Sequence, residues 1–259
     1  MKNNEASQWL SVAAEAARRA GAYLLQSTQN SRYIIKDKER DVKIAADGSS
    51  ESIILNYLHE HSAFSILSEE RGLVERKSNS TVWIVDPLDG SLNYSRGIQL
   101  CCVSIGLWEE NQPVLGVIYD FHRDELYSGI AGKGAWCNEL EIKASDVNRK
   151  DKAILCTGFP VNTDFSAESL MTFIQNIQQY KKIRLLGSAA LSLAYVASGR
   201  ADAYMENDIM VWDVAGGLAI ALGAGCICEI REGVNPNSLH VYVSSALLMS
   251  NGLQHENIL

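Results

Sequence analysis

The sequence lacks two features: a long uncharged apolar run and an excess of positive charge. Without about 20 consecutive apolar residues, no segment is expected to span a membrane. Glu5 and Glu15 interrupt the N-terminal region, which is therefore unlike a secretory signal. The formal net charge is −8 and the pI is near 5.2. Because an acidic surface repels nucleic-acid backbones, we expect no nucleic-acid partner, although bound cations could still attract a small phosphate ester.

The chain has five histidines and six cysteines, and neither set forms a metal-binding pattern. His59 and His61 are two residues apart in an expected helix, so they do not face each other. Cys226 and Cys228 share one strand face, but no second pair accompanies them, and we expect no zinc site. Several cysteines lie in apolar runs, as buried free thiols do. We therefore expect reduced thiols and a cytoplasmic protein.

Hydrophobic residues make up 47% of the 259 residues, which is enough for a large core. Residues 6–26 place apolar side chains at helical spacing, and a second helix is expected over residues 50–61. Short strands are then expected over residues 64–67, 82–86, 101–107, 114–120 and 125–130. Short strands that follow paired helices favour an α+β half, which we place at residues 1–150.

From residue 151 onward, the expected strands and helices alternate. Strands are expected over residues 153–157, 183–185, 201–206 and 226–230, with helices near residues 167–179, after Ser188 and at Asp213. Ser188 is a favourable N-cap for its helix. This alternation predicts an α/β half over residues 151–259.

The most informative segment is the run WIVDPLDGS, which ends at Ser91. Its apolar part reaches Asp86, and Pro87, which has no N–H to donate to a neighbouring strand, should end the strand there. Asp89 adds a second carboxylate, and Gly90 allows a close backbone approach. Such oxygen ligands and free N–H groups suit Mg²⁺ and phosphate. Taken alone, the segment is equally compatible with an ordinary turn.

Two further carboxylates lie at the ends of expected elements. Glu69 belongs to a Glu-Glu pair that follows the apolar residues 64–67, and Asp213 opens a helix rich in small residues. An alternative is that both side chains only cap helices or pair with surface cations. The combination with Asp86 and Asp89 favours a shared metal site over that alternative.

These motifs resemble those of the inositol monophosphatase family of magnesium-dependent, lithium-sensitive sugar and polyol phosphatases. Residues 86–91 match the signature Asp-Pro-(Ile/Leu)-Asp-Gly-(Thr/Ser), and Trp212-Asp213 with the following Ala-Gly matches a second signature. Glu69 matches the family's metal-binding Glu. The resemblance covers roughly residues 13–245. It implies a layered α-β-α-β-α sandwich of the inositol monophosphatase and fructose-bisphosphatase type, with the active site between the two halves.

The resemblance also implies a site for two or three Mg²⁺ ions, for which Mn²⁺ could substitute. Asp86 would bridge the ions, with Glu69 on one side and Asp89 and Asp213 on the other. The carbonyl group of Leu88 would face a metal. Two ions about 3.5–4 Å apart can clamp a phosphoryl group and activate water for in-line attack.

By resemblance, Ser91 is expected to hydrogen-bond the attacking water and Asp47 to help activate it. Asp47 is also placed to cap the second helix, and both roles could hold together. The family usually has Thr three residues before this Asp, whereas this chain has Ile44 there, preceded by Lys43. The N–H groups of Gly90 and Ser91, at an expected helix start, should receive phosphate oxygens.

Glu206 is the main candidate for recognition of the leaving group. It lies seven residues before Asp213, the spacing at which inositol-type members hold a polyol hydroxyl, although a surface carboxylate at a strand end is the alternative. Ser188 and Ala189 match a segment whose backbone lines the sugar pocket in relatives. Asn93 is typical of inositol and sugar phosphatases, whereas relatives acting on nucleotides or histidinol phosphate usually carry Lys at that position.

Arg96 stands where many relatives have His, and Gln99 where they have Pro. Arg96 could bind a second anion or lie on the surface. The leading interpretation is a magnesium-dependent phosphomonoesterase that acts on inositol monophosphate or a related sugar or polyol phosphate. The alternatives are a fructose 1,6-bisphosphatase or a nucleotide phosphatase (3′-phosphate or NADP) on the same scaffold, and a non-catalytic regulatory protein. The resemblance favours a homodimer.

Overall fold

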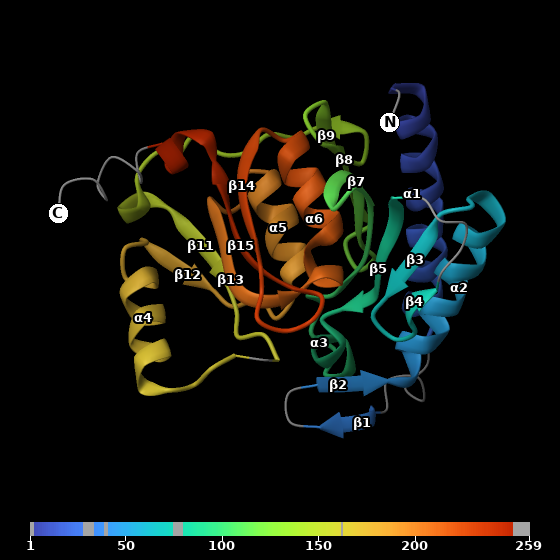
Figure 1. The fold of residues 1–259 in the computed structure, drawn as a ribbon, viewed down its shortest axis with the longest axis horizontal. Helices are drawn as coiled ribbons and strands as arrows, with labels where there is room; N and C mark the ends of the chain where they lie inside the picture. The colour runs from blue at the N-terminus through green and yellow to red at the C-terminus, as the bar shows by residue number, and fades with distance from the viewer. Residues whose placement is uncertain (1–2, 28–33, 39–40, 75–79, 162, 251–259) are drawn as a thin grey trace.

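A computed structural model describes residues 3–27, 34–38, 41–74, 80–161 and 163–250. Helices and sheets alternate in layers across the molecule (Figure 1). Helices α1 (Asn3–Gln26) and α2 (Ala45–His61) cover one face of a large sheet, and α5 (Ala189–Ala197) and α6 (Val211–Gly223) lie between that sheet and a smaller one. Helix α4 (Ala167–Ile177) lies against the outer side of the smaller sheet. This order confirms the expected α-β-α-β-α sandwich.

The large sheet has eight strands in the order β10-β9-β8-β7-β6-β5-β3-β4. Only β3 and β5 pair in parallel, and the other neighbours are antiparallel. The strands are β3 (Ser65–Ser68), β4 (Gly72–Val74), β5 (Thr81–Asp89), β6 (Cys102–Glu109), β7 (Gln112–Asp120), β8 (Glu125–Ile130), β9 (Gly134–Cys137) and β10 (Leu140–Glu141).

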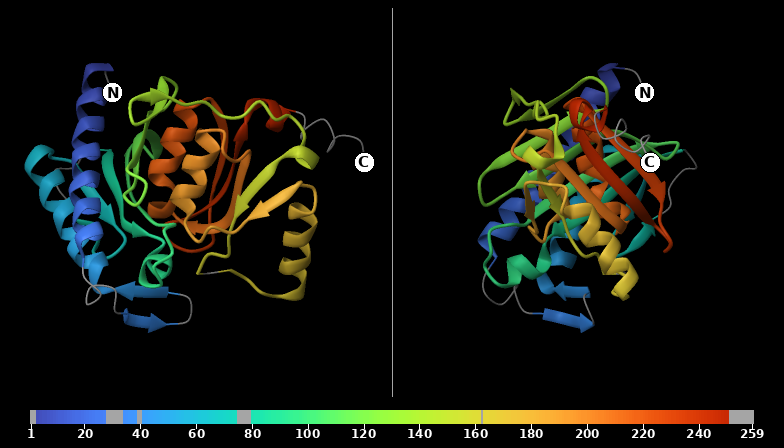
Figure 2. Two further views of the ribbon diagram at one scale, coloured as in Figure 1. Left: turned by 180° about the vertical axis from the view of Figure 1, so that it is seen from behind. Right: turned by 90° about the vertical axis from the view of Figure 1, so that its left-hand side faces the viewer.

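The smaller sheet has five strands in the order β12-β11-β13-β15-β14. Its strands are β11 (Ile154–Thr157), β12 (Lys182–Arg184), β13 (Ala203–Met210), β14 (Cys226–Glu232) and β15 (Ser238–Ser245). A separate hairpin of β1 (Ile34–Lys38) and β2 (Asp41–Ile44) lies beside the short helix α3 (Ser91–Ser95), at one end of the layers (Figures 1 and 2). A 3₁₀ turn (Lys150–Lys152) precedes β11.

Helices α5 and α6 are apolar on nearly all sides, as expected for helices buried between two sheets. Helix α6 lies very close to the large sheet because glycine occurs on both elements. A β-carbon added at Gly116 of β7 would collide with the backbone of Gly216 in α6. The close approach fixes the N-terminal end of α6, and therefore Asp213, beside the end of β5.

The expectation that the strand ends at Pro87 is wrong, because β5 continues to Asp89. Its pairing with β6 shifts register between Asp86, opposite Ser104, and Asp89, opposite Cys102. The shift is a β-bulge, where a residue without an N–H is tolerated. On the other side of β5, the pairing with β3 has already ended at Val85.

The second helix begins at Ala45, earlier than expected, and Asp47 is therefore not its N-cap. Asp47 lies in the first turn, and one of its carboxylate oxygens accepts a 2.7 Å hydrogen bond from the N–H of Ile44. Ile44 has no side-chain acceptor, so the carboxylate that reaches back satisfies this helix start instead. The expected N-cap at Ser188 is confirmed, since its side chain accepts a hydrogen bond from the N–H of Leu191.

The chain leaves the large sheet at Glu141 and enters the smaller one at Ile154. The expected division into halves at residues 1–150 and 151–259 stays a prediction, and residues 251–259 lie outside the described residues. Within the described residues, no helix combines the length and the apolar character that crossing a membrane requires.

Candidate active site

A pocket of about 440 Å³ lies where β5 ends, beside α3 and the start of α6. We call it the carboxylate pocket. Seven of the residues predicted from the motifs line it: Glu69, Asp86, Leu88, Asp89, Gly90, Ser91 and Asp213. The structure therefore brings together side chains from three separate motifs.

The bulge in β5 explains why two carboxylates of one strand reach the same pocket. Leu88 donates its N–H to Oδ1 of Asp86 over 2.9 Å, which closes the backbone around the bulge. Gly90 follows with φ 85°, a left-handed conformation, and serves as N-cap of α3. A β-carbon at Gly90 would lie 2.7 Å from the carbonyl oxygen of Leu100, so only glycine fits this turn.

Glu69 and Asp213 reach the pocket from neighbouring elements. Glu69 follows β3, and its N–H donates to the carbonyl oxygen of Val85 on the parallel strand β5 over 3.2 Å. Asp213 lies in the first turn of α6. Asp86 is within hydrogen-bonding reach of both side chains. The four carboxyl groups, counting Asp89, thus face one another across a small space.

Without a bound cation, the ionised forms of these carboxyl groups are unfavourable, because the groups are buried and repel one another. Burial, together with the like charge of Glu70, raises the pKa of Glu69 to about 8. Burial and the neighbouring carboxylates raise the pKa values of Asp86 and Asp213 well above the ordinary value. A multivalent cation would relieve both the desolvation and the repulsion.

The donor set fits a hard cation, because it consists of carboxylate oxygens and one backbone carbonyl, the ligands that Mg²⁺ prefers. No group of three His, Cys, Asp or Glu side chains among the described residues is already arranged to hold a metal ion. The pocket therefore has the ligand types that Mg²⁺ prefers, close together, but their oxygens are not yet in coordinating positions. The side chains would turn their oxygens toward the ion on binding.

Asp89 is held in place by the start of α5. Oδ2 of Asp89 accepts hydrogen bonds from the hydroxyl of Ser188 at 2.5 Å and from the N–H of Ala190 at 2.8 Å. Burial raises the pKa of Asp89 to about 6, and these hydrogen bonds oppose the rise. Both bonds use Oδ2, and together they fix the orientation of the carboxylate at the edge of the pocket.

Ser91 and Asp47 form a polar pair at the edge of the pocket. The hydroxyl of Ser91 lies 3.0 Å from Oδ1 of Asp47 and 2.8 Å from the carbonyl oxygen of Leu88. Burial raises the pKa of Asp47 to about 7. A carboxyl group with a pKa near neutrality can accept and return a proton, so the pair is suited to general acid–base work.

Lys43, at the end of the β1–β2 hairpin, also lines the carboxylate pocket. Its Nζ lies 2.9 Å from Oε2 of Glu70, and its charge opposes the rise in the pKa values of Glu69 and Asp47. The motifs did not predict a role for this residue. Its position one residue before Ile44, where the chain departs from the family pattern, was the available signal.

Glu206 is not among the residues that line the carboxylate pocket. It lines a neighbouring cavity of about 320 Å³, which we call the Phe159 cavity. Burial, with the like charge of Asp89, raises the pKa of Glu206 to about 8, and only the neutral hydroxyl of Tyr204 opposes the rise. Glu206 is 8% exposed, so it is not a freely solvated surface carboxylate.

The remaining predicted substrate residues lie outside the carboxylate pocket. Ser188 and Ala189 are buried at the start of α5. Their predicted role in lining the sugar pocket stays a prediction. Arg96 is exposed at the end of α3 and lines neither this pocket nor the Phe159 cavity. Asn93 ties α3 to the turn before α5, since its amide donates to the carbonyl oxygen of Leu186 over 2.8 Å.

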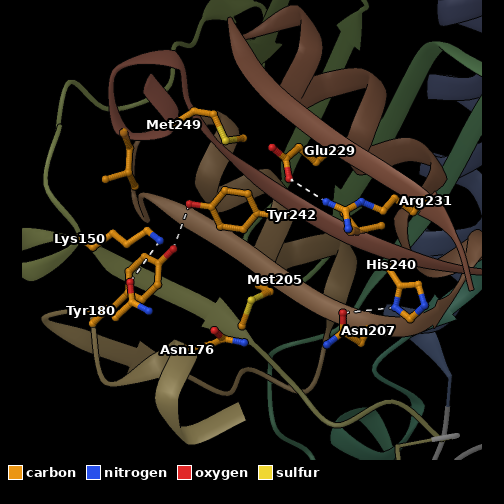
Figure 3. A pocket seen from close by; sticks show the side chains of 13 residues that line it. Lys150, Asn176, Tyr180, Met205, Asn207, Glu229, Arg231, His240, Tyr242 and Met249 are labelled. Atoms are coloured by element: carbon orange, nitrogen blue, oxygen red, sulfur yellow. Dashed lines mark hydrogen bonds and ion pairs between the residues drawn. The ribbon is translucent and has the colours of Figure 1, made fainter. Parts of the chain in front are cut away.

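A larger pocket of about 520 Å³ lies on the outer face of the smaller sheet and contains none of the predicted site residues (Figure 3). Tyr242 and His240 of β15 point into it, and the hydroxyl of Tyr242 lies 3.0 Å from that of Tyr180. Val241 and Val243, which alternate with them, are buried in the core. The pocket shares Met205, Asn207 and His240 with the Phe159 cavity but no lining residue with the carboxylate pocket.

Comparisons with known proteins agree with the motifs and the fold. The profile described as "Inositol monophosphatase family" matches residues 5–259. The chain is 38% identical to "Nus factor SuhB" of Xylella fastidiosa, over 86% of this chain and 82% of that protein. It is 37% identical to "Inositol monophosphatase 3" of Solanum lycopersicum, over 86% of each chain.

The fold comparison gives the same answer. The solved structure of inositol monophosphatase from Anabaena superposes with a TM-score of 0.81 at 33% identity, covering 96% of this chain and 94% of that one. The carboxylate motifs, the layered fold and the match along the sequence lead to one conclusion: the chain belongs to the inositol monophosphatase family.

Proposed function

We propose that this chain is a magnesium-dependent phosphomonoesterase that hydrolyses inositol monophosphate or a related sugar or polyol phosphate. One observation carries the proposal. Glu69, Asp86, Asp89 and Asp213 converge in one pocket, and none of the four has a salt bridge among the described residues. Such a cluster is stable at neutral pH only with bound cations or retained protons.

The metal ligands would be these four carboxylates and the carbonyl group of Leu88. We propose two or three Mg²⁺ ions per site, with Mn²⁺ as a substitute. Bound Mg²⁺ would supply Lewis-acid polarisation of the phosphoryl group and a more acidic water. Asp86, which lies between Glu69 and Asp213, is the residue best placed to be shared between ions.

Proton transfer is assigned to Asp47 and Ser91. The hydroxyl of Ser91 lines the pocket and lies 3.0 Å from Asp47, so it can orient an attacking water and pass its proton to the carboxylate. The raised pKa of Asp47, about 7, suits that task near neutral pH. The N–H groups of Gly90 and Ser91 would hold phosphate oxygens beside them.

Recognition of the alcohol is assigned to Glu206, with the backbone of Ser188 and Ala189 as a further contact. Cations bound in the neighbouring carboxylate pocket would lower the raised pKa of Glu206, and the resulting carboxylate could accept charge-assisted hydrogen bonds from hydroxyl groups of a polyol. Arg96 remains open as a contact to a second anion. Fructose 1,6-bisphosphate and nucleotide phosphates are the corresponding alternative substrates.

The name of one relative supports a second candidate function. The chain is similar to a protein called a Nus factor, so a regulatory role, with or without catalysis, is the alternative from another class.

We also propose a homodimer in the cytoplasm. The six cysteines, all without disulfides, are consistent with that compartment.

A phosphate-release assay with Mg²⁺ tests the proposal on inositol 1-phosphate, fructose 1,6-bisphosphate and adenosine 3′,5′-bisphosphate. We expect the highest kcat/KM on inositol 1-phosphate and no activity in excess chelator. Two results together would favour the regulatory candidate instead. The protein would hydrolyse none of a broad panel of phosphate esters, and the Asp213→Asn variant would restore growth to a strain from which the gene has been deleted.

A further inference from the structure

We propose that the Phe159 cavity is a second subsite that binds an aromatic group attached to the polyol of the substrate. The inference rests on the proposed function and deepens it, because it names a class of ester: polyol or sugar phosphates with an aryl substituent. Three observations carry it, namely an aromatic wall, a buried carboxylate and a shared loop.

The aromatic wall comes from the loop after β11 and from α4. Phe159 and Phe173 line the cavity, and their ring centroids are 4.8 Å apart at an interplanar angle of 44°. Leu170 and Met205 add apolar surface. Phe159 is nevertheless 40% exposed, so its ring is only partly used in packing. An aromatic ligand would cover that surface and gain ring–ring contact.

The polar wall is Glu206. Its side chain is buried, and no described cation pairs with it. The backbone of Gly158 lies directly against it, since a β-carbon there would lie 2.7 Å from Oε1 of Glu206. A larger residue at position 158 would cover the carboxylate. The chain therefore keeps an acceptor for hydroxyl groups beside an apolar surface.

The cavity and the carboxylate pocket are neighbours. Pro160 and Thr163 line the cavity, while Val161 of the same loop lines the carboxylate pocket. Glu206 also raises the pKa of Asp213, so the two carboxylates are within electrostatic range. An ester could place its phosphate among the carboxylates, its hydroxyls on Glu206 and its substituent against the exposed surface of Phe159.

The competing explanation is that the phenylalanines only fasten the loop to α4. Phe165 provides a matched control, because it is 41% exposed and its ring centroid lies 5.5 Å from that of Phe159, yet it does not line the cavity. Loss of Phe165 would also loosen the loop, because its ring contacts that of Phe159, but it would leave the wall of the cavity in place. Only loss of Phe159 would remove the proposed ligand contact.

The experiment compares phenyl glucoside 6-phosphate with methyl glucoside 6-phosphate, which differ only in the aglycone. We expect the native protein to prefer the phenyl ester by about three- to tenfold in kcat/KM, the range that one aromatic contact supplies. Phe159→Ala should remove the preference, so that kcat/KM becomes the same for the two esters. Phe165→Ala should keep the preference.

Calorimetric titration with the same two esters in Ca²⁺ gives a readout that does not depend on turnover. Tighter binding of the phenyl ester, lost in Phe159→Ala only, supports the subsite. Equal binding of the two esters, or equal effects of the two substitutions, overturns it. If neither ester nor inositol 1-phosphate is hydrolysed, the proposed function fails, and the titration still decides whether the cavity binds an aryl group.

Discussion

The hydroxyl of Ser188 donates a 2.5 Å hydrogen bond to Oδ2 of Asp89, a residue 99 positions earlier in the chain. Ser188 is the N-cap of α5, and its oxygen also accepts the N–H of Leu191 at 3.2 Å. One hydroxyl therefore starts a helix in the middle layer and orients a carboxylate at the end of β5. A short charge-assisted hydrogen bond of this kind fixes the direction of the carboxylate.

Replacing Ser188 by Ala should lower both stability and activity. Loss of the cap costs about 1 kcal/mol of unfolding free energy. Loss of the bond to Asp89 should reduce kcat/KM by about tenfold or more, because a misplaced ligand is costly in catalysis. Ser188→Thr should restore most of both. Ser166→Ala, which removes the N-cap of α4 from a surface site, is the control for capping alone and should leave kcat/KM unchanged.

Asp213→Asn should abolish metal-dependent turnover and stabilise the metal-free protein. The raised pKa of Asp213 lowers the unfolding free energy at neutral pH, and asparagine does not ionise, so the melting temperature without metal should rise by a few degrees. The rate should fall by orders of magnitude. Calorimetry should also find that Mg²⁺ no longer raises the melting temperature. Near-normal turnover, or an unchanged response to Mg²⁺, would exclude Asp213 as a ligand.

Glu206→Gln should change the choice of substrate and leave the metal chemistry intact. The carboxylate lies outside the carboxylate pocket, so Mg²⁺-dependent cleavage of a simple aryl phosphate should persist. On the preferred polyol phosphate, kcat/KM should fall by about tenfold or more, equivalent to roughly 1.4 kcal/mol. Asp213→Asn should depress both substrates alike. An unchanged ratio of the two kcat/KM values in Glu206→Gln would remove Glu206 from substrate recognition.

Lys43→Met should lower the Mg²⁺ concentration needed for half-maximal activity. The ammonium group of Lys43 lies 2.9 Å from Oε2 of Glu70, and its positive charge also acts on Glu69 in the carboxylate pocket. That charge would repel a Mg²⁺ ion entering the pocket. Removing it should strengthen Mg²⁺ binding by about threefold or more, which a calorimetric titration would measure directly. Lys150→Met, in the outer pocket, is the control. A higher Mg²⁺ requirement would contradict this and indicate a direct contact of Lys43 with the phosphate.

Inhibition by Li⁺ tests whether the metal site of this chain behaves as the family resemblance implies. If Asp86, Asp89 and Asp213 hold one metal position, Li⁺ should occupy it and slow turnover. Initial rates in LiCl would be compared with those in KCl at equal ionic strength. Superimposable curves would rule out lithium sensitivity but would leave the phosphatase proposal standing.

Local pattern was sufficient to predict much of the fold. The apolar spacing over residues 6–26 predicted α1, and the strand at residues 125–130 was placed as observed. We did not predict β15, although Leu239, Val241 and Val243 alternate with polar residues in it. The start of α2 was placed too late, because Asp47 is used inside the first turn and not as its cap.

The set of carboxylates could be identified without a structure, because their spacing around Asp86 and their positions at element ends are local features of the chain. How these carboxylates face one another depends on long-range packing. Pro87 lies in a bulge that exists only because β6 pairs across it, with Ser104 opposite Asp86 and Cys102 opposite Asp89. Glu206 faces a separate cavity since the loop after β11 packs against it. Strand register and loop packing depend on contacts with residues that are distant in the sequence, so they cannot be predicted from the local sequence.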